Sequence, residues 1–363
     1  RLVFVEYYVS WCILFLLFGF GKTLISIPDR SYDVESWERV KNKNLFDIGI
    51  ITLFILIIIY DLYLIRDLPF FYILDGDIIG AEEAKGRFFD ARMTSSIPMI
   101  GYLMQYFPLF ALGWTFDRYL KSKKILGFMI VLIFLIIYSG LTLIKSYALM
   151  PFIVAFLVYF SYKKNKINFS LALKTTFVGL LVILLPFSLL AEEFNNDVFF
   201  NIVERIFMVQ IQGAFLIRSL FDGFEMSALL EGAPLLKRFG FETMDPAAEV
   251  FRIIWGEQAF LDGFVNINSH FIGQGFVMFG HSIVVVGPII IFLNAALLTL
   301  CYRFFLHSPF RSIAGIVLLT SAALIPINNN FGNTVYFKSL LGMIFLIITI
   351  APIYFASTRL SLK

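Results

Sequence analysis

Long apolar runs recur along most of the chain, and they limit its possible folds more than any other feature. Hydrophobic residues make up 59% of the 363 residues and charged residues only 15%, whereas about a quarter of the residues of a soluble domain are charged. A helix needs about 20 apolar residues to cross the hydrocarbon core of a bilayer. The sequence therefore predicts an all-α, polytopic membrane bundle, with 1–363 forming a single integral membrane domain.

Nine of these runs are predicted to be membrane-crossing helices. They lie near 2–21, 45–65, 97–116, 125–143, 148–162, 171–190, 276–302, 312–327 and 339–356. The sequence begins at Arg1 and enters the first apolar run at once. We therefore expect that residues precede it and that nine is a minimum.

The short connections between the runs predict the orientation, because Lys and Arg are retained on the cytoplasmic side of a membrane. Alternation through the nine runs places four basic segments on one side, namely 117–124, 163–168, 303–311 and the C-terminal residues. We expect that side to be cytoplasmic. The two longer segments 67–96 and 192–270 then lie outside, and 192–270 is long and amphipathic enough to form helices at the outer interface.

The two long outer segments are acidic but contain a few arginines. Segment 67–96 has six acids and three bases, and segment 192–270 has twelve acids and five bases. Six of these eight bases are arginines: Arg87, Arg92, Arg205, Arg218, Arg238 and Arg252. A guanidinium grips phosphate or carboxylate with two hydrogen bonds, which an ammonium cannot do. Any one arginine can instead pair with a nearby acid, but as a set they predict an anion site on the outer face.

Other polar residues stand where the chain enters or leaves the predicted membrane. Lys145 follows the fourth run and can either extend to the interface or face the same anion. His270 ends the long outer segment, two residues after Asn268, and histidine can transfer protons at neutral pH. We expect His281, which follows Gly280, to be a packed membrane histidine.

Motifs for nucleotides, metals and dinucleotides are absent from the sequence. It has no Walker motif, His-Glu-x-x-His motif, Gly-x-Ser-x-Gly motif or dinucleotide-binding glycine pattern. Cys12 and Cys301 lie far apart in apolar runs and offer neither a disulfide framework nor zinc spacing. We therefore expect no metal, no cofactor and no nucleic-acid partner.

Four features of the chain together match a known pattern. They are the apolar bundle with a long outer segment before its last helices, the short turn within 142–149, the segment around Arg87 and Arg92, and the approach from Asn266 to Gly280. Arg252 and Gly263 also have ten residues between them, a spacing found in some members of the same family. The chain thereby resembles the Wzy-type polymerases of bacterial surface polysaccharides, which are relatives of O-antigen ligase.

The resemblance implies a GT-C-like fold and a metal-independent glycosyltransferase. Such a polymerase moves a growing glycan from undecaprenyl pyrophosphate onto the terminal sugar of a new lipid-linked repeat unit. It works at the outer face of the bacterial cytoplasmic membrane, together with membrane lipid and a protein that regulates chain length. Arginines that meet the charge gathering on the departing pyrophosphate would accelerate this transfer.

The resemblance also implies roles for particular residues of this sequence. The catalytic residues would be His270, Arg252 and Arg205, with His270 activating the acceptor hydroxyl. The residues that bind the pyrophosphate or the glycan would be Arg87, Arg92, Arg218, Arg238, Lys145, Asn268 and Tyr336.

Three other functions stay open at this point. An O-antigen ligase-like transferase would use the same donor and a lipid A-type acceptor. A GT-C enzyme that uses a lipid monophosphate sugar would employ Asp75 or Asp77 as its base. A transporter is less favoured, because transporters place polar, broken helices near the membrane midplane, whereas Gln105 and Asn294 are among the few polar exceptions in the predicted spans.

Overall fold

A computed structural model describes most of the predicted helices. The described residues are 2–21, 43–65, 67–77, 80–81, 83–85, 87, 100–143, 145–163, 209–231, 239–258, 271–308, 310–324 and 331–359. The secondary structure of this part is entirely helical, with no β-strand among the described residues. The predicted all-α fold class is therefore confirmed.

The long helices match the predicted apolar runs closely. They are α1 (Leu2–Phe20), α3 (Lys43–Ile65), α6 (Ile100–Ser122), α7 (Ile125–Thr142), α8 (Lys145–Lys163), α17 (Ile283–Leu306), α18 (Arg311–Ala323) and α20 (Lys338–Arg359). Shorter helices are α4 (Pro69–Leu74), α11 (Val209–Leu220), α12 (Met226–Glu231), α14 (Pro246–Trp255), α16 (Phe271–Phe279), η3 (Gly280–Ser282) and α19 (Phe331–Val335).

Membrane-crossing capacity is clear for four helical stretches of the described part. Asn44–Ile65, Ile125–Thr142, Phe271–Leu306 and Lys338–Thr358 are long and apolar enough to cross a membrane, and Val5–Phe20, Met150–Tyr162 and Ile313–Ala323 are shorter apolar helices. The chain is thus a helical protein with the character of a membrane protein. The predicted run 171–190 lies outside the described residues, so the count of nine spans stays a prediction.

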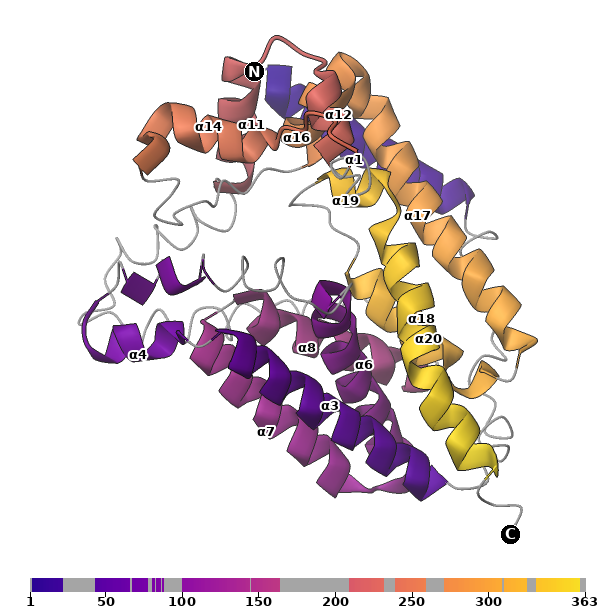
Figure 1. Ribbon diagram of the computed structural model, residues 1–363. Helices are drawn as coiled ribbons and strands as arrows, with labels where there is room; N and C mark the ends of the chain where they lie inside the picture. The colour runs from indigo at the N-terminus through magenta and orange to yellow at the C-terminus, as the bar shows by residue number, and fades with distance from the viewer. Residues whose placement is uncertain are drawn as a thin grey trace, which may run out of the picture.

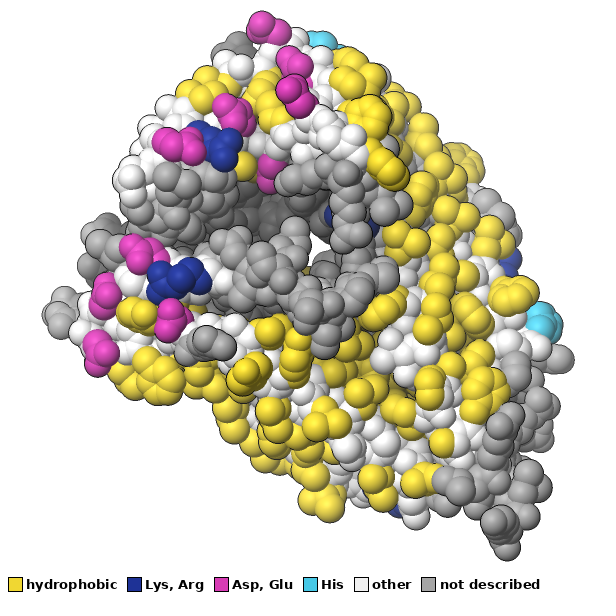
Figure 2. Space-filling model, in the orientation of Figure 1, with side chains coloured by type: hydrophobic (Ala, Val, Ile, Leu, Met, Phe, Trp, Pro, Cys, Tyr) yellow, Lys and Arg dark blue, Asp and Glu magenta, His cyan; other side chains and the backbone are white. Residues whose placement is uncertain are grey.

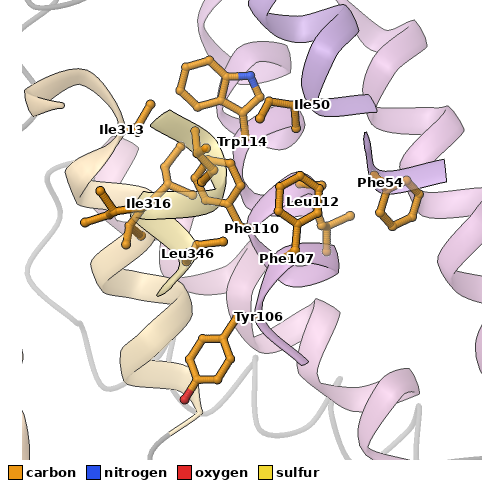
Figure 3. Close-up of a cluster of buried hydrophobic side chains, with 14 of the residues drawn as sticks. Ile50, Phe54, Tyr106, Phe107, Phe110, Leu112, Trp114, Ile313, Ile316 and Leu346 are labelled. Atoms are coloured by element: carbon orange, nitrogen blue, oxygen red, sulfur yellow. The ribbon is translucent and has the colours of Figure 1, made fainter. Parts of the chain in front are cut away.

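The lower bundle consists of α3, α6, α7, α8, α18 and α20 (Figure 1). Helix α6 lies at its centre and buries Phe107, Phe110 and Trp114. Figure 3 shows these side chains between Ile50 of α3 on one side and Ile313 of α18 on the other. Because helix α6 is apolar around most of its circumference, it can be enclosed by neighbours on several sides.

The upper lobe consists of α1, α11, α12, α14, α16, α19 and the first half of α17 (Figure 1). Its core is α16, in which every residue from Phe271 to Met278 is buried. Glycine makes this packing possible, because a Cβ at Gly275 would overlap the side chain of Ile283. The upper lobe therefore has its own apolar core, separate from that of the lower bundle.

The directions of the helices define two ends of the molecule. Near the start of α3, Asp47 binds Arg118 near the end of α6, and Phe46 contacts Tyr354 near the end of α20. Tyr354 also contacts Phe310, which precedes α18. We call this the basic end, because it carries Arg118, Lys121, Lys123 and Lys124. The upper lobe and α4 lie at the opposite end, which we call the α16 end.

The predicted loop 117–124 is largely helical, which corrects the sequence interpretation. Helix α6 continues to Ser122. Asp117 accepts a hydrogen bond from Lys121 at 2.8 Å, and Asp47 binds Arg118 at 2.8 Å. Because these partners neutralise the basic side chains, the helix extends five residues past the acidic Asp117 before Lys123 turns the chain.

The predicted span 276–302 is wrong at its start. Gly280 has φ +61°, a left-handed conformation that interrupts the helix and that glycine adopts without strain. A Cβ at Gly287 would lie 2.6 Å from Cε2 of Phe271, whereas in one straight helix these residues would be about 24 Å apart. Helix α16 therefore folds back against the start of α17, and the apolar stretch 271–306 does not form one continuous span.

Candidate functional site

The surface at the α16 end is hollowed between the upper lobe and the part of the chain that bears α4. Figure 2 shows a basic group flanked by acidic groups on each lip of this hollow. On the upper lip, Arg252 of α14 lies 3.5 Å from Glu249 and 3.4 Å from Glu257. On the lower lip, Arg87 lies 3.4 Å from both Asp67 and Glu83. Two predicted site arginines therefore lie on segments that border the hollow, Arg252 in α14 and Arg87 beside Tyr72 of α4.

The ion pairs on the lips are solvent-exposed, which affects what they can do. The side chain of Arg252 is 40% exposed and that of Arg87 is 47% exposed. Exposed ion pairs stabilise a fold by only about 0–1 kcal/mol. A phosphate or carboxylate that offers better geometry can therefore displace these carboxylates at small cost. The Tyr72 hydroxyl is a third partner of Arg87, because it accepts a hydrogen bond from Nη2 at 3.3 Å.

The sequence of α14 explains why Arg252 reaches the lip. Asp245 caps the helix by accepting a hydrogen bond from the Ala247 N–H at 2.9 Å, and proline occupies the first helical position. Val250 and Phe251 are buried against the lobe. Arg252, the next residue, therefore points away from the core. The helix ends at Gly256, whose φ is +90°.

The cap of α14 leads to a pH-dependent prediction. Burial raises the pKa of Asp245 above 3.8, against an opposing effect of hydrogen bonds from Ala247 and Ala248. The folded state therefore binds this proton more tightly than the unfolded state, so stability falls as pH rises through this window.

We expect Asp245→Asn to keep or increase the stability of α14 at neutral pH, because it retains the cap oxygen without the charge. Asp245→Ala loses the cap and should cost about 1 kcal/mol. Hydrogen exchange of the α14 amides measures both effects. Equal destabilisation by the two variants would contradict this account of the cap.

A second polar cluster lies within the upper lobe and consists of Glu6, Arg218 and His281. Arg218 ends α11 and forms an ion pair with Glu6 of α1. Its guanidinium carbon lies 4.2 Å from the centre of the Phe276 ring. The side chains of Arg218 and Glu6 are only 6% and 10% exposed, and burial lowers the pKa of Arg218. The charge of this predicted site arginine is therefore already matched inside the fold.

His281 differs from the sequence expectation. Its side chain is 67% exposed, and its Nδ1 lies 3.1 Å from Glu6 Oε1. The prediction of a packed membrane histidine is therefore wrong. The physical reason is the break at Gly280, which places His281 in the turn η3 on the outer surface of the upper lobe.

The remaining predicted residues fall into two groups. Tyr336 is half-buried, and its hydroxyl donates a hydrogen bond to the Leu229 carbonyl at 2.7 Å, which joins α12 to the turn after α19. Lys145 begins α8, but its side chain lies outside the described part of the structure. Arg92, Arg205, Arg238, Asn268 and His270 also lie outside it.

Two ionisable residues in apolar runs were missed by the sequence analysis. Glu6 lies in the first run, and Asp61 lies in α3, where it is fully buried and accepts a hydrogen bond from the Tyr138 hydroxyl. An acid within a membrane-type helix is costly and therefore marks a functional or structural contact. An acidic residue within an apolar run can be seen in the sequence, so Glu6 and Asp61 could have been identified there.

Asp75 and Asp77, the base candidates of the lipid-monophosphate alternative, lie in an exposed turn after α4. Oδ1 of Asp77 accepts a hydrogen bond from the Gly80 N–H at 2.8 Å. Asp77 therefore has a local structural role in starting the next turn.

Comparisons with models of known protein families, with curated proteins and with solved structures found no match.

Proposed function

We propose that this chain is a membrane glycosyltransferase that joins lipid-pyrophosphate-linked oligosaccharide repeat units in the hollow at the α16 end. The observation that supports the proposal most is the position of two arginines on segments that border that hollow, Arg252 in α14 and Arg87 beside α4. Two guanidinium groups from opposite sides suit a ligand with two phosphates, because each fork can bind one phosphate with two hydrogen bonds.

The proposed reaction needs stabilisation of a leaving group. The bond between the anomeric carbon and the pyrophosphate oxygen breaks, and a new bond forms from that carbon to the acceptor hydroxyl oxygen. Negative charge then gathers on the lipid pyrophosphate while the acceptor proton passes to a base. Arg252 and Arg87 would exchange their carboxylate partners for this pyrophosphate, and the freed carboxylates Glu249 and Glu83 would face the sugar hydroxyls.

The proposed orientation places the basic end in the cytoplasm and the hollow outside a bacterial cytoplasmic membrane. It is supported by the directions of α3, α6, α18 and α20, which bring basic segments to the same end. Basic short segments are retained on the cytoplasmic side. The donor and acceptor would then both be lipid-linked glycans of the outer leaflet.

Polar side chains buried in the described helices support an enzyme over a transporter. Asn294 donates hydrogen bonds to the carbonyls of Ile290 and Thr334, at 3.0 Å and 2.8 Å. Gln274 accepts one from the Phe331 N–H at 2.5 Å. These groups therefore join α16, α17 and α19 rather than lining a path through the membrane.

The test is reconstitution of the purified protein with an undecaprenyl-pyrophosphate oligosaccharide of one repeat unit. We expect a ladder of longer products, and a decrease in rate of about 10²–10³-fold in Arg252→Ala and in Arg87→Ala, as for other donors that stabilise transition-state charge. Arg303→Ala, at the basic end, is the matched control and should keep the wild-type rate.

Unchanged laddering in both lip variants would reject the site. Absence of any ladder with the cognate repeat unit would reject the polymerase function. Transfer of a single glycan to a lipid A-type acceptor, without laddering, would instead support the ligase-like alternative, which shares the donor.

A further inference from the structure

The turn between α16 and α17 is held by a histidine that faces two opposite charges. Nδ1 of His281 lies 3.1 Å from Glu6 Oε1 of α1 and 3.2 Å from Arg218 Nη2 of α11. Arg218 and Glu6 also form their own ion pair. Three elements therefore meet at one ring nitrogen.

One ring nitrogen cannot make both of these hydrogen bonds at once. When Nδ1 carries no proton, its lone pair accepts a hydrogen bond from Arg218, and Glu6 is bound by Arg218 alone. When Nδ1 carries a proton, it donates to Glu6 and can no longer accept from Arg218. The proton on Nδ1 therefore decides whether the turn is bound to α11 or to α1, and the fully protonated ring always carries one there.

Charge adds to this exchange of hydrogen bonds. The cluster is neutral when His281 is neutral, because Arg218 and Glu6 cancel. A second proton on the ring gives the cluster a net charge of +1 and places two cations side by side, with Nδ1 3.2 Å from Arg218 Nη2, so that they repel although water reaches the imidazole. Glu6 then has two cationic partners, Arg218 and the protonated His281, whereas Arg218 loses its hydrogen bond to Nδ1 of His281.

The position of Arg218 links this exchange to the re-entrant helix. Its guanidinium lies over the ring of Phe276 in α16, with 4.2 Å between the guanidinium carbon and the ring centre. Helix α11 packs along α16, and α16 turns back at Gly280, directly before His281. Arg218 therefore joins α11 both to α16, through Phe276, and to the turn after α16, through His281, and loss of its hydrogen bond to His281 removes one of these two connections.

Two charged groups face His281 among the described residues. The charged groups that face it are Glu6 from α1 and Arg218 from α11, and α16 contributes the Phe276 ring at 5.2 Å. Helix α17 begins with apolar residues. The exposed imidazole can exchange protons with bulk water, while its two partners are nearly enclosed.

We propose that His281 is a proton-operated switch that exchanges the partner of the α16–α17 turn between Arg218 and Glu6, and so sets how firmly α11 holds the re-entrant helix α16. The switch does not depend on the proposed glycosyltransferase function.

Hydrogen exchange of the full chain in lipid nanodiscs tests the switch without any activity assay. After correction for intrinsic exchange, amides of α11 and α16 should open about fivefold more often at about pH 5.5 than at about pH 7.5, the equivalent of one hydrogen bond. His281→Asn retains an acceptor for Arg218 but carries no ionisable ring, so its α11 and α16 amides should lack the increase in opening at low pH that the wild type shows.

His307→Asn is the matched control, because His307 is exposed at the basic end, at the end of α17. This variant should keep the wild-type pH dependence. If His281→Asn does not fold, His281→Gln takes its place with the same expectation. The proposal is overturned if wild-type exchange in α11 and α16 is independent of pH, or if the His281 variant responds to pH as the wild type does.

Discussion

Replacing Arg218 by Ala should destabilise the upper lobe by about 3–5 kcal/mol, because it leaves the carboxylate of Glu6 inside the protein without a cation. The two side chains are 6% and 10% exposed, so water cannot easily solvate the carboxylate that remains. The replacement also removes the contact of the guanidinium with Phe276. Thermal unfolding in nanodiscs, with hydrogen exchange of α11 and α16, measures the loss.

A paired replacement separates the buried charge from the volume of the side chain. Glu6→Leu combined with Arg218→Met should recover most of the lost stability, because apolar residues of similar size often replace a buried ion pair without cost. A double variant that is as unstable as Arg218→Ala would show that packing alone explains the loss.

Replacing Arg118 by Ala should destabilise the basic end of the lower bundle by a similar amount, about 3–5 kcal/mol. Arg118 binds Asp47 through Nε at 3.0 Å and through Nη2 at 2.8 Å, and the same carboxylate accepts a hydrogen bond from the Trp114 indole at 3.0 Å. These bonds fasten the end of α6 to the start of α3. Loss of the cation therefore leaves Asp47 with an uncompensated charge.

Arg118→Lys should give an intermediate loss, because an ammonium keeps the charge but cannot form the two parallel bonds of the guanidinium. Lys123→Ala is the control, since Lys123 is exposed in the turn after α6, and it should change the unfolding midpoint little. Wild-type stability in Arg118→Ala would contradict the role given to this pair.

The helices themselves could be predicted from the sequence. Eight of the nine predicted apolar runs coincide with helices of the described part, and the ninth, 171–190, lies outside it. The prediction succeeds because burial in a bilayer requires continuous apolar sequence and internal backbone hydrogen bonding, which only helices provide within one segment. It fails at 276–302, because an apolar run has the same composition whether it crosses a membrane or folds back on itself.

The candidate site could be predicted only in part. Arg252 and Arg87 lie in the two long polar segments 192–270 and 67–96, and their residue type predicted an anion site before their positions were known. The same reasoning gave Arg218 the same role, but the fold encloses it with Glu6. Residue type and charge count cannot distinguish an arginine on a lip from an arginine in a core, because both stand in acidic surroundings.

The sequence by itself determined the fold class and the approximate places of the helices, except for the end of α6 and the start of α17, and it predicted that basic segments share one end. These properties depend on local composition, which can be read directly from the sequence. Only the tertiary structure decided that α16 is re-entrant, that the segments of Arg252 and Arg87 border one hollow, and that His281 stands between Glu6 and Arg218. Each of these brings together residues far apart in the chain, and their contacts depend on how helices pack rather than on any local pattern.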